Sequence, residues 1–265
     1  MIIIMLGDVV GEPGLIILEK RLPALIEEYK ADFIVVNGEN AAAGFGLTKE
    51  TLDRILAAGA DVVTSGNHIW EKREFWPVLE FSAQPNGKPV LRPANYPVMS
   101  SDEVPGRGWM LLSKNDLSVL VINLQGRELM TPIDCPFRCF DTIAAENNNV
   151  PIVVDFHAES VEEKEALAYY LDGRAAIMAG THTHVQTADE RILPNGTAYI
   201  SDLGMSGAMN GVIGMDKDIC ISRTRSQIAR RLECANAEEQ DCAIQGIVVE
   251  LDKKGKALSI SRISR

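Results

Sequence analysis

Apolar segments alternate with polar turns along most of the chain, in the order that is typical of strands followed by helices. Ile2 to Leu6 is a run of large aliphatic residues, and it predicts a buried parallel strand that places Asp8 beyond its carboxyl end. After a turn that contains Pro13 and Gly14, the apolar residues from Leu15 to Lys30 recur at helical spacing. The segment therefore predicts a strand, a turn and a helix in succession.

Two similar units follow. Asp32 to Val36 predicts a strand, and Thr48 is suited to cap a helix that runs toward Ala58. Asp61 to Thr64 predicts a short strand that precedes an amphipathic stretch near Glu71 to Phe81. The polar residues that close these two strands are Asn37, Gly38, Glu39 and Asn40, and then Ser65, Gly66, Asn67 and His68.

The second half of the chain continues the pattern. The predicted strands are Leu117 to Leu124, Pro151 to Phe156 before His157, and Ala175 to Ala179 before Gly180-Thr181-His182-Thr183-His184. Ser160 and Glu163 fit a capping box that opens a helix toward Leu171. Cys242 to Leu251 and Ala257 to Ile263 flank a polar turn and predict a hairpin.

Strands that alternate with helices build an α/β fold with a parallel sheet, and such sheets bind ligands beyond the carboxyl ends of their strands. No internal repeat, low-complexity tract or linker interrupts the sequence. With 265 residues, of which 46% are hydrophobic and 24% charged, we expect a single domain over 1–265.

Charge and composition narrow the class of protein. A net charge of -11 opposes docking onto duplex nucleic acid, although bound cations would still allow a small phosphorylated substrate. The apolar start of the chain is too short for a membrane span and lacks a basic leader, so we expect a soluble, cytoplasmic protein without a membrane partner. The five cysteines include no CxxC pair, which argues against a disulfide scaffold.

All four histidines follow or end predicted strands. They are His68, His157, His182 and His184, and they are accompanied by Asp8, Glu39, Asn40 and Asn67. Imidazole and carboxylate together suit zinc, manganese or iron. Because strand residues two apart share a face, His182 and His184 can both face one metal cluster, and Glu39 can bridge two cations with its two oxygens.

Each residue also has a structural alternative. Asp8 can serve only as a cap, Asn40 and Asn67 can serve only in turns beside glycine, and a buried histidine is often a hydrogen-bonded core residue. The pair His182 and His184 favours a metal, because two imidazoles on one face are costly to desolvate with nothing bound. Four further acids are expected to be caps or solvated turn residues outside the metal site: Asp155, Glu159, Asp189 and Asp202.

Several strings extend this pattern over nearly the whole chain. They are GDVVG at 7–11, NGENAA at 37–42, GNHIW at 66–70, RPAN at 92–95, NLQGR at 123–127, DFHAE at 155–159, GTHTHVQTAD at 180–189 and DLGM at 202–205. Together they resemble the YmdB-type branch of the calcineurin-like metallophosphoesterases. In the broader superfamily a histidine usually follows the first aspartate by two positions, where Val10 stands here, and an aspartate usually stands in the place of Glu39.

The resemblance implies a four-layer αββα sandwich with two mixed β-sheets and a dinuclear site at one edge. One metal would take Asp8, Glu39, Asn40 and His184, and the other would take Glu39, Asn67, His157 and His182. Iron or manganese is implied, and zinc also suits the ligands. The implied activity is a phosphodiesterase that acts on 2′,3′- or 3′,5′-cyclic nucleotides, with His68 as the acid that protonates the leaving oxygen.

We hypothesise that a hydroxide bridging the two metals attacks phosphorus directly, because no Ser or Cys lies in an evident nucleophile setting. Two alternatives remain open. The same dinuclear site could serve a phosphomonoesterase or nuclease, or the chain could be a regulatory protein that binds nucleotide with little turnover. A homo-oligomer, either a dimer or a tetramer, is also expected, without an identified interface.

Overall fold

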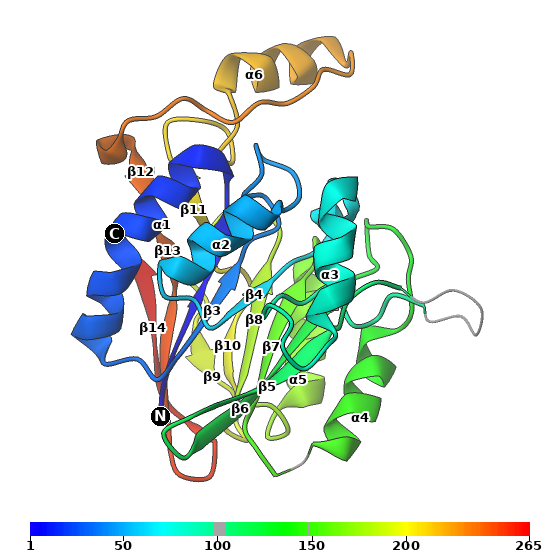
Figure 1. Cartoon of the computed structure of the whole chain (residues 1–265), viewed down its shortest axis with the longest axis vertical. Helices are drawn as coiled ribbons and strands as arrows, with labels where there is room; N and C mark the ends of the chain where they lie inside the picture. The colour runs from blue at the N-terminus through cyan, green and yellow to red at the C-terminus, as the bar shows by residue number, and fades with distance from the viewer. Residues whose placement is uncertain (98–103, 148) are drawn as a thin grey trace.

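The structure is a computed structural model that describes residues 1–97, 104–147 and 149–265, and its strands form three sheets (Figure 1). The first sheet contains β1 (Ile2–Leu6), β3 (Phe33–Asn37), β4 (Val62–Thr64), β13 (Gln245–Leu251) and β14 (Ala257–Ser264), in the order β14-β13-β1-β3-β4. The second contains β5 (Trp109–Lys114), β6 (Leu117–Gln125), β7 (Ile152–His157), β8 (Ile177–Thr181), β9 (Arg191–Ile192) and β10 (Ala198–Ile200), in the order β5-β6-β7-β8-β10-β9. The third contains β2 (Asp8–Val9), β11 (Met205–Ala208) and β12 (Cys242–Ala243).

The helices are α1 (Gly11–Tyr29), α2 (Lys49–Ala57), α3 (Trp76–Ser82), α4 (Pro136–Glu146), α5 (Val161–Leu171) and α6 (Lys217–Ser226), with the short 3-10 turns η1 (Asn67–Trp70), η2 (Arg73–Phe75) and η3 (Glu239–Asp241). Helices α1 and α2 cover the five-stranded sheet, helices α4 and α5 cover the six-stranded sheet, and the remaining helices lie at the edges or beyond them. In the ranges that the structure describes, no helix is both long enough and apolar enough to cross a bilayer.

The alternation of side chains along β1 divides the core into separate apolar layers. Ile4 and Leu6 point to one face of the five-stranded sheet, where they pack with residues of α1 and α2 such as Leu18 and Ile55. Ile3 and Met5 point to the other face, where they pack with residues of β6, β7 and β8 in a second cluster. A third cluster lies between the six-stranded sheet and helices α4 and α5. The two large sheets therefore face each other across one shared apolar layer.

Both large sheets are mixed. β1 pairs in parallel with β3 and antiparallel with β13, and β6, β7, β8 and β10 run in parallel between the antiparallel edge strands β5 and β9. The mixed α/β class is confirmed. The strands predicted from apolar runs are confirmed as β1, β3, β4, β6, β7 and β8, and the hairpin of β13 and β14 is confirmed as well.

The structure corrects two details of the helices. The predicted turn around Pro13 and Gly14 is the first turn of α1, where proline is tolerated because that amide hydrogen would have no helical partner. The capping box of α5 is only half formed. Ser160 accepts a hydrogen bond from the Glu163 amide, but the Glu163 carboxylate accepts from the backbone amides of Arg127 and Glu128 instead.

The stretch near Glu71 to Phe81 also differs from the prediction, because it is divided between η2 and α3. Pro77 in the first turn of α3 explains the late start of that helix, since proline suits a helix start better than a helix interior. Thr48 caps α2 as predicted, and its hydroxyl accepts a hydrogen bond from the amide of Thr51.

Gly7 separates β1 from β2, and the two strands belong to different sheets. A Cβ atom at Gly7 would lie 2.0 Å from the carbonyl oxygen of Gly204, so only glycine fits there. The next residue, Asp8, pairs with Met205 of β11, and its side chain is completely buried. The small third sheet thus fixes the position of Asp8 at the end of the five-stranded sheet.

Candidate metal centre

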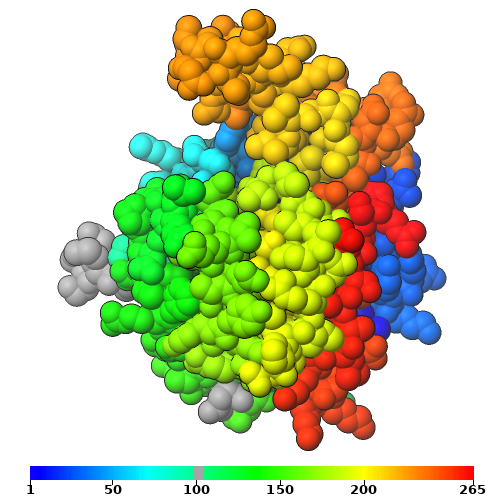
Figure 2. Space-filling view, turned by 180° about the vertical axis from the view of Figure 1, so that it is seen from behind, coloured from blue at the N-terminus to red at the C-terminus, as the bar shows by residue number. Residues whose placement is uncertain are grey.

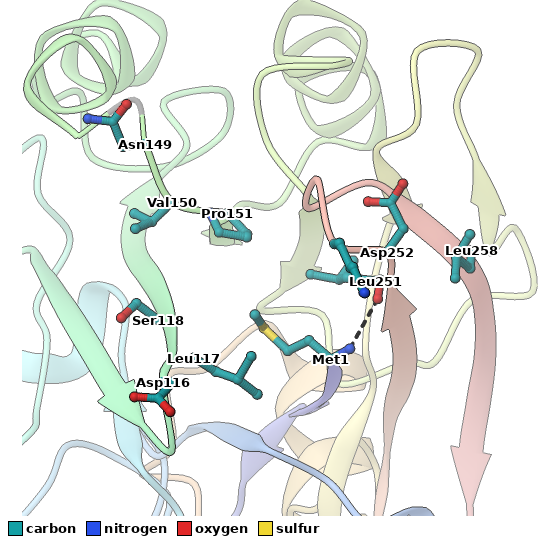
Figure 3. Close-up of a pocket in the computed structure, with 11 residues that line it drawn as sticks. Met1, Asp116, Leu117, Ser118, Asn149, Val150, Pro151, Leu251, Asp252 and Leu258 are labelled. Carbon is teal, nitrogen blue, oxygen red and sulfur yellow. Dashed lines mark hydrogen bonds between the residues drawn. The ribbon is translucent and has the colours of Figure 1, made fainter.

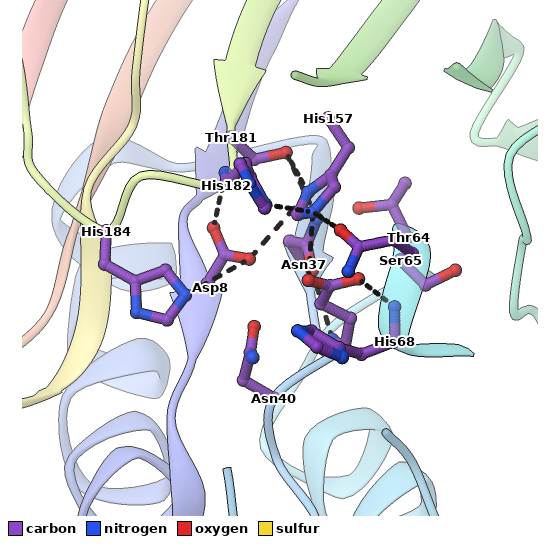
Figure 4. Close-up of polar contacts among 12 residues, drawn as sticks. Asp8, Asn37, Asn40, Thr64, Ser65, His68, His157, Thr181, His182 and His184 are labelled. Atoms are coloured by element: carbon purple, nitrogen blue, oxygen red, sulfur yellow. Dashed lines mark hydrogen bonds and ion pairs between the residues drawn. The ribbon is translucent and has the colours of Figure 1, made fainter. Parts of the chain in front are cut away.

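The residues predicted for the metal site lie at one edge of the molecule, beyond the carboxyl ends of strands from both large sheets. Asp8 follows β1, Glu39 and Asn40 follow β3, Asn67 and His68 follow β4, His157 ends β7, and His182 and His184 follow β8. Figure 4 shows His184 on one side of Asp8 and His157 and His182 on the other. The two sheets face each other, so residues distant in sequence meet at this edge.

His157 is the centre of one half of the cluster. Its Nε2 atom lies 2.9 Å from Oε1 of Glu39 and 2.9 Å from Nδ1 of His182. The same Nε2 atom lies 3.2 Å from Oδ1 of Asn67. One ligand atom from each of Glu39, His157 and His182 falls within 4.8 Å of the others, an arrangement that could hold a metal ion.

The other half contains Asp8, Asn40 and His184. Oδ1 of Asp8 lies 3.9 Å from Nε2 of His184, and Nδ2 of Asn40 donates to the carbonyl oxygen of Gly44 at 2.9 Å. Oδ1 of Asp8 and Oδ1 of Asn40 are buried, and neither has a hydrogen-bond partner among the described residues. Such an oxygen costs about 1–3 kcal/mol when it is left unsatisfied. A cation bound between these residues would satisfy both oxygens, so the donor set fits a metal.

Burial and neighbouring charges shift the pKa values within the cluster. Burial raises the pKa of Asp8 to about 6 against the opposing effect of His184 and His157. Burial would also raise the pKa of Glu39, but the charge and hydrogen bond of His157, together with His68, lower it to about 2.

The two adjacent imidazoles shift in opposite directions. Burial would lower the pKa of His157, but the carboxylates of Glu39 and Asp8 raise it to about 9. Burial and the neighbouring His157 lower the pKa of His182 to about 3. Glu39 and His157 therefore form a buried ion pair, while His182 beside them is neutral.

A buried chain of hydrogen bonds orients His157. The Thr181 hydroxyl donates to Oδ1 of Asp155 at 2.7 Å, so it accepts from Nδ1 of His157, which lies 2.9 Å away. In the neutral imidazole this arrangement leaves Nε2 without a proton and free to bind a metal. A Cβ atom at Gly66 would lie 2.0 Å from Cδ2 of His157, so a glycine is needed beside this ring.

Asp155 was expected to be a cap or a solvated turn residue, and that expectation is wrong. Its carboxylate is buried and accepts hydrogen bonds from Thr64, Thr181 and Asn37. Burial raises the pKa of Asp155. The sequence held a sign of this role, because Asp155 lies two residues before His157 in a strand and so shares its face.

The prediction that His182 and His184 share a strand face is also wrong. β8 ends at Thr181, and His182 and His184 have φ values of 105° and 63°, so both lie in a turn and not in a strand. The turn nevertheless brings both rings to the cluster. Nδ1 of His184 lies 2.9 Å from the carbonyl oxygen of Ile213, which leaves Nε2 facing Asp8.

Asp202 holds this turn in place through hydrogen bonds to Thr183. The expectation that Asp202 is a cap or a solvated turn residue is therefore also wrong. Its buried carboxylate accepts from the amide and hydroxyl of Thr183 at 3.1 and 2.8 Å. The same carboxylate pairs at 2.9 Å with Nζ of Lys164, which is also fully buried. The ion pair thus connects α5 to the turn that carries His182 and His184.

His68 occupies the open side of the cluster. Its backbone amide donates to Oε2 of Glu39 at 3.1 Å, and its Nδ1 lies 3.2 Å from Oε1 of Glu71. The ring of Phe45 contacts the His68 ring edge to face, with 5.0 Å between the centroids. Glu159, which was placed outside the site, is half-exposed, and its carboxylate lies 3.1 Å from Nε2 of His182. Glu71 and Glu159 are the side chains whose contacts with the cluster sequence reasoning missed here.

A separate cavity of about 730 Å³ lies at the opposite end of the strands (Figure 3). Its walls include Met1, Leu117, Pro151 and Leu251, which precede β1, begin β6, precede β7 and end β13. None of the described residues that line it is a histidine or a cysteine. The chemistry expected from the sequence is therefore located at the carboxyl ends of the parallel strands and not in this cavity.

Comparison with known proteins gives consistent matches over the whole chain. Residues 4–263 match the family model described as YmdB-like protein. A 2′,3′-cyclic-nucleotide 2′-phosphodiesterase of Bacillus subtilis (strain 168) is 43% identical over 264 residues, covering 98% of this chain and 96% of the relative.

Two solved structures are also similar over most of their length. A hypothetical protein from Thermus thermophilus has a TM-score of 0.91 at 35% identity, with 100% of this chain and 99% of that chain covered. A novel phosphatase from Mycoplasma pneumoniae has a TM-score of 0.89 at 31% identity, with 100% and 93% covered.

Proposed function

Because the chain belongs to the YmdB-like protein family, we propose that it is a metal-dependent phosphodiesterase that hydrolyses cyclic nucleotides. One observation carries the proposal: Glu39, His157 and His182 offer ligand atoms within 4.8 Å, beside buried oxygens of Asp8 and Asn40 that have no hydrogen-bond partner in the described part of the chain. The Bacillus subtilis relative acts on 2′,3′-cyclic nucleotides, which supports that class of substrate first and 3′,5′-cyclic nucleotides second.

We infer that these residues would hold two metal ions, with Glu39 as a ligand to both. Asp8, Asn40 and His184 would complete the ligands of one ion, and Asn67, His157 and His182 those of the other. Two such ions lower the pKa of a shared water and clamp the phosphoryl oxygens when bound. Iron or manganese fits this mixture of imidazole, carboxylate and amide oxygen, and zinc fits it as well.

The protein's own groups would perform the remaining steps. Thr181 and Asp155 hold the His157 ring, and the carbonyl of Ile213 holds the ring of His184. His68 would protonate the leaving oxygen. Its contact with Glu71 orients the ring from one side, and its partial exposure leaves the other ring nitrogen accessible to a substrate.

We expect direct displacement, in which oxygen from water attacks phosphorus without a covalent intermediate on the protein. Ser65, which follows β4 near the cluster, donates its hydroxyl to the carbonyl of Leu91 at 2.7 Å, and no described residue is paired with it as a base. A single turnover in heavy-oxygen water should place the label in the product phosphate. An unlabelled product from the first turnover would contradict direct attack.

The layer order is also inferred. Three apolar clusters separate helices from sheet, sheet from sheet, and sheet from helices, which supports the four-layer αββα sandwich of the metallophosphoesterases. Because the two sheets share one of these clusters, we infer a single domain over residues 1–265.

The test of function begins with metal analysis of anaerobically purified protein. We expect about two metal ions per chain, and restoring that metal to chelated protein should restore hydrolysis of 2′,3′-cyclic nucleotides. Hydrolysis that is unaffected by chelation would contradict the proposal. Binding of cyclic nucleotide with hydrolysis near background would favour a regulatory protein instead.

A phosphomonoesterase is the second candidate, because the Mycoplasma pneumoniae structure is that of a phosphatase. Turnover of bis(p-nitrophenyl) phosphate should exceed that of p-nitrophenyl phosphate if the diester assignment is right. The reverse preference would favour the monoesterase on the same site.

A further inference from the structure

A further cavity, of about 1050 Å³, lies between α4 and the edge strand β5. We name it the arginine cavity, because Arg92, Arg107 and Arg138 line it. Residues of α4, drawn in green, lie at the surface of the molecule in Figure 2 and cover the six-stranded sheet in Figure 1. Cavities that bind small molecules typically have volumes of about 300–1000 Å³. None of the residues assigned to the candidate metal centre is among the described residues that line this cavity, so the two are separate.

Arg92 lies in the wall of the arginine cavity without a carboxylate partner among the described residues. The residue is only 6% exposed, and its Nε and Nη1 atoms donate to the carbonyls of Pro105 and Pro93 at 3.2 and 2.8 Å. No described residue accepts a hydrogen bond from Nη2 or forms an ion pair with Arg92, whereas the buried Lys164 pairs with Asp202. An arginine remains charged in proteins, and a buried charge without a counterion is costly. An anion in the cavity would supply the missing charge.

Arg107 and Arg138 bring two further positive charges to the cavity. Nη2 of Arg107 donates to the carbonyl of Gln84 at 3.0 Å, and its Nε is buried without a hydrogen-bond partner among the described residues. Arg138 is exposed, and it forms no ion pair within the part of the chain that the structure describes. Asp134 is the one acid among the described residues that line the cavity, and it is exposed. Three guanidinium groups therefore gather in one cavity of a chain whose net charge is -11.

The start of α4 adds further positive polarity. Cys135 precedes the helix, and its side chain caps none of the first amides. A helix start attracts anions and disfavours cations, yet Arg138 lies in the first turn of α4. Burial raises the pKa of Cys139 to about 11, so this thiol beside Arg92 stays neutral and supplies no negative charge. The helix start and the guanidinium groups therefore both favour a bound anion.

β5 and Tyr96 give the cavity an apolar wall. Trp109 and Leu111 are 36% and 48% exposed, and because they are two residues apart in the strand they lie on the same face. Both line the cavity, as does Tyr96, whose ring packs edge to face on Trp70 with 5.3 Å between the centroids. Planar bases stack on aromatic side chains. A ligand with a planar ring beside its anionic group would cover apolar residues that the chain leaves exposed.

We propose that the arginine cavity binds a nucleoside monophosphate, at a site distinct from the candidate metal centre. Its phosphate would pair with the guanidinium groups of Arg92, Arg107 and Arg138, because arginine binds phosphate through paired hydrogen bonds. Its base would lie against Trp109 and Leu111. A phosphate monoester carries a charge of about −1.5 to −2 at neutral pH, whereas a carboxylate carries a single charge and would leave more of the arginine charge unbalanced.

Isothermal titration calorimetry of the full chain tests the class of ligand. In a chelator that removes metal, and at about 0.05 M salt, adenosine 5′-monophosphate should bind at about one site per chain, and this site should remain when metal is restored. Adenosine, which lacks the phosphate, and inorganic phosphate, which lacks the ring, should each bind at least roughly tenfold more weakly. Absence of nucleotide binding in chelator would overturn the proposal, and adenosine 5′-carboxylate binding as tightly as the phosphate would overturn the choice of phosphate.

The double variant Arg107→Gln, Arg138→Gln tests the guanidinium groups. Loss of two charge-assisted hydrogen bonds should raise the dissociation constant for the nucleotide at least roughly tenfold. The matched control Arg230→Gln, Arg231→Gln makes the same charge change at exposed positions beyond α6 and should bind like wild type. None of these four residues is buried, so circular dichroism should show that both variants are folded. Wild-type affinity in the variant of Arg107 and Arg138 would contradict the proposal.

Thiol labelling locates the ligand. Cys135 lines the cavity and Cys242 does not, and both are half-buried. Saturating nucleotide should slow the alkylation of Cys135 and leave that of Cys242 unchanged, as measured by mass spectrometry of the digested protein. Equal rates at Cys135 with and without nucleotide would place the ligand elsewhere and overturn the proposal. Binding is measured without metal and no step follows hydrolysis, so failure here is separate from failure of the proposed function.

Discussion

The two halves of the candidate metal centre differ in how their polar atoms are satisfied. On one side, Glu39 and His157 form a buried ion pair with 2.9 Å between Oε1 and Nε2. On the other side, Oδ1 of Asp8 and Oδ1 of Asn40 are buried without a hydrogen-bond partner among the described residues. In the first half the negative charge of Glu39 is balanced by the positive charge of protonated His157. A metal ion can bind Nε2 of His157 only after that atom has lost its proton. The second half is held open.

Backbone contacts explain why the second half does not close. Nδ2 of Asn40 is held by the carbonyl of Gly44, and Nδ1 of His184 by the carbonyl of Ile213. Oδ1 of Asn40 and Nε2 of His184 therefore remain directed toward Asp8. Nε2 of His184 stays 3.9 Å from Oδ1 of Asp8, which is longer than the 2.9 Å between Glu39 and His157. The difference teaches that a preformed site and a self-paired site can lie side by side, and our proposal assigns Glu39 as a ligand in both.

Removal of Glu39 should break both halves at once and give the largest effect. Glu39→Ala removes the carboxylate that we propose as a ligand to both metal ions, so we expect metal content to fall from about two ions per chain to none. Turnover should fall by more than roughly 10⁴-fold, because the metal-dependent activation of water is lost. Metal analysis and a cyclic nucleotide assay measure the two effects.

Glu50→Ala, at an exposed position of α2, is the matched control and should leave both quantities unchanged. Retention of two metals by Glu39→Ala would refute the shared carboxylate.

Replacement of His68 should leave both halves intact and slow the reaction alone. His68 contacts Glu39 only through its backbone amide, so His68→Ala keeps that hydrogen bond and should bind metal normally. Loss of the general acid should reduce turnover by roughly 10² to 10⁴. If the variant loses metal instead, the imidazole of His68 must be assigned as a ligand.

Replacement of Asp155 should affect one half and spare the other, with the smallest effect of the three. In the wild type the hydroxyl groups of Thr64 and Thr181 donate to the Asp155 carboxylate. Asp155→Asn replaces one carboxylate oxygen by an NH2 group that cannot accept, which disturbs Thr181 and the orientation of His157. The affinity of the His157 side for metal should fall roughly 10- to 100-fold, while the Asp8 side retains its ion.

Metal titration should then show one weakened site in Asp155→Asn and two unchanged sites in Asp189→Asn, a matched change at a more exposed acid. Equal weakening of both sites in Asp155→Asn would show that the two halves are not independent.

The sequence was sufficient to locate most of the fold and the residues that meet at the sheet edge. Apolar runs of the length of Ile2 to Leu6, each followed by polar residues, fixed the parallel strands and the edge at which they end. The histidines and carboxylates could then be placed together because every one of them follows such a strand. The family resemblance supplied the grouping into two ligand sets.

The contacts that orient these side chains could not be predicted from spacing. Asp155 meets Thr64 and Asn37 only because two different sheets face each other, and Asp202 meets Lys164 only because α5 packs behind β8. The turn at His182 and His184 requires positive φ values in residues that seldom adopt them, which local propensity does not indicate. In each case the packing of distant elements determines the side-chain contact or the backbone conformation.

The place of β1 in its sheet sets the order in which this protein can fold on the ribosome. β1 is made first, yet it lies between β3 and β13, with Ile4 opposite Val248. Pairing over so long a stretch of chain is slow, and the central strand keeps one open edge until β13 has been synthesised. The turn that presents Asp8 is thus completed late, so a nascent chain should acquire metal only after β13 has been synthesised.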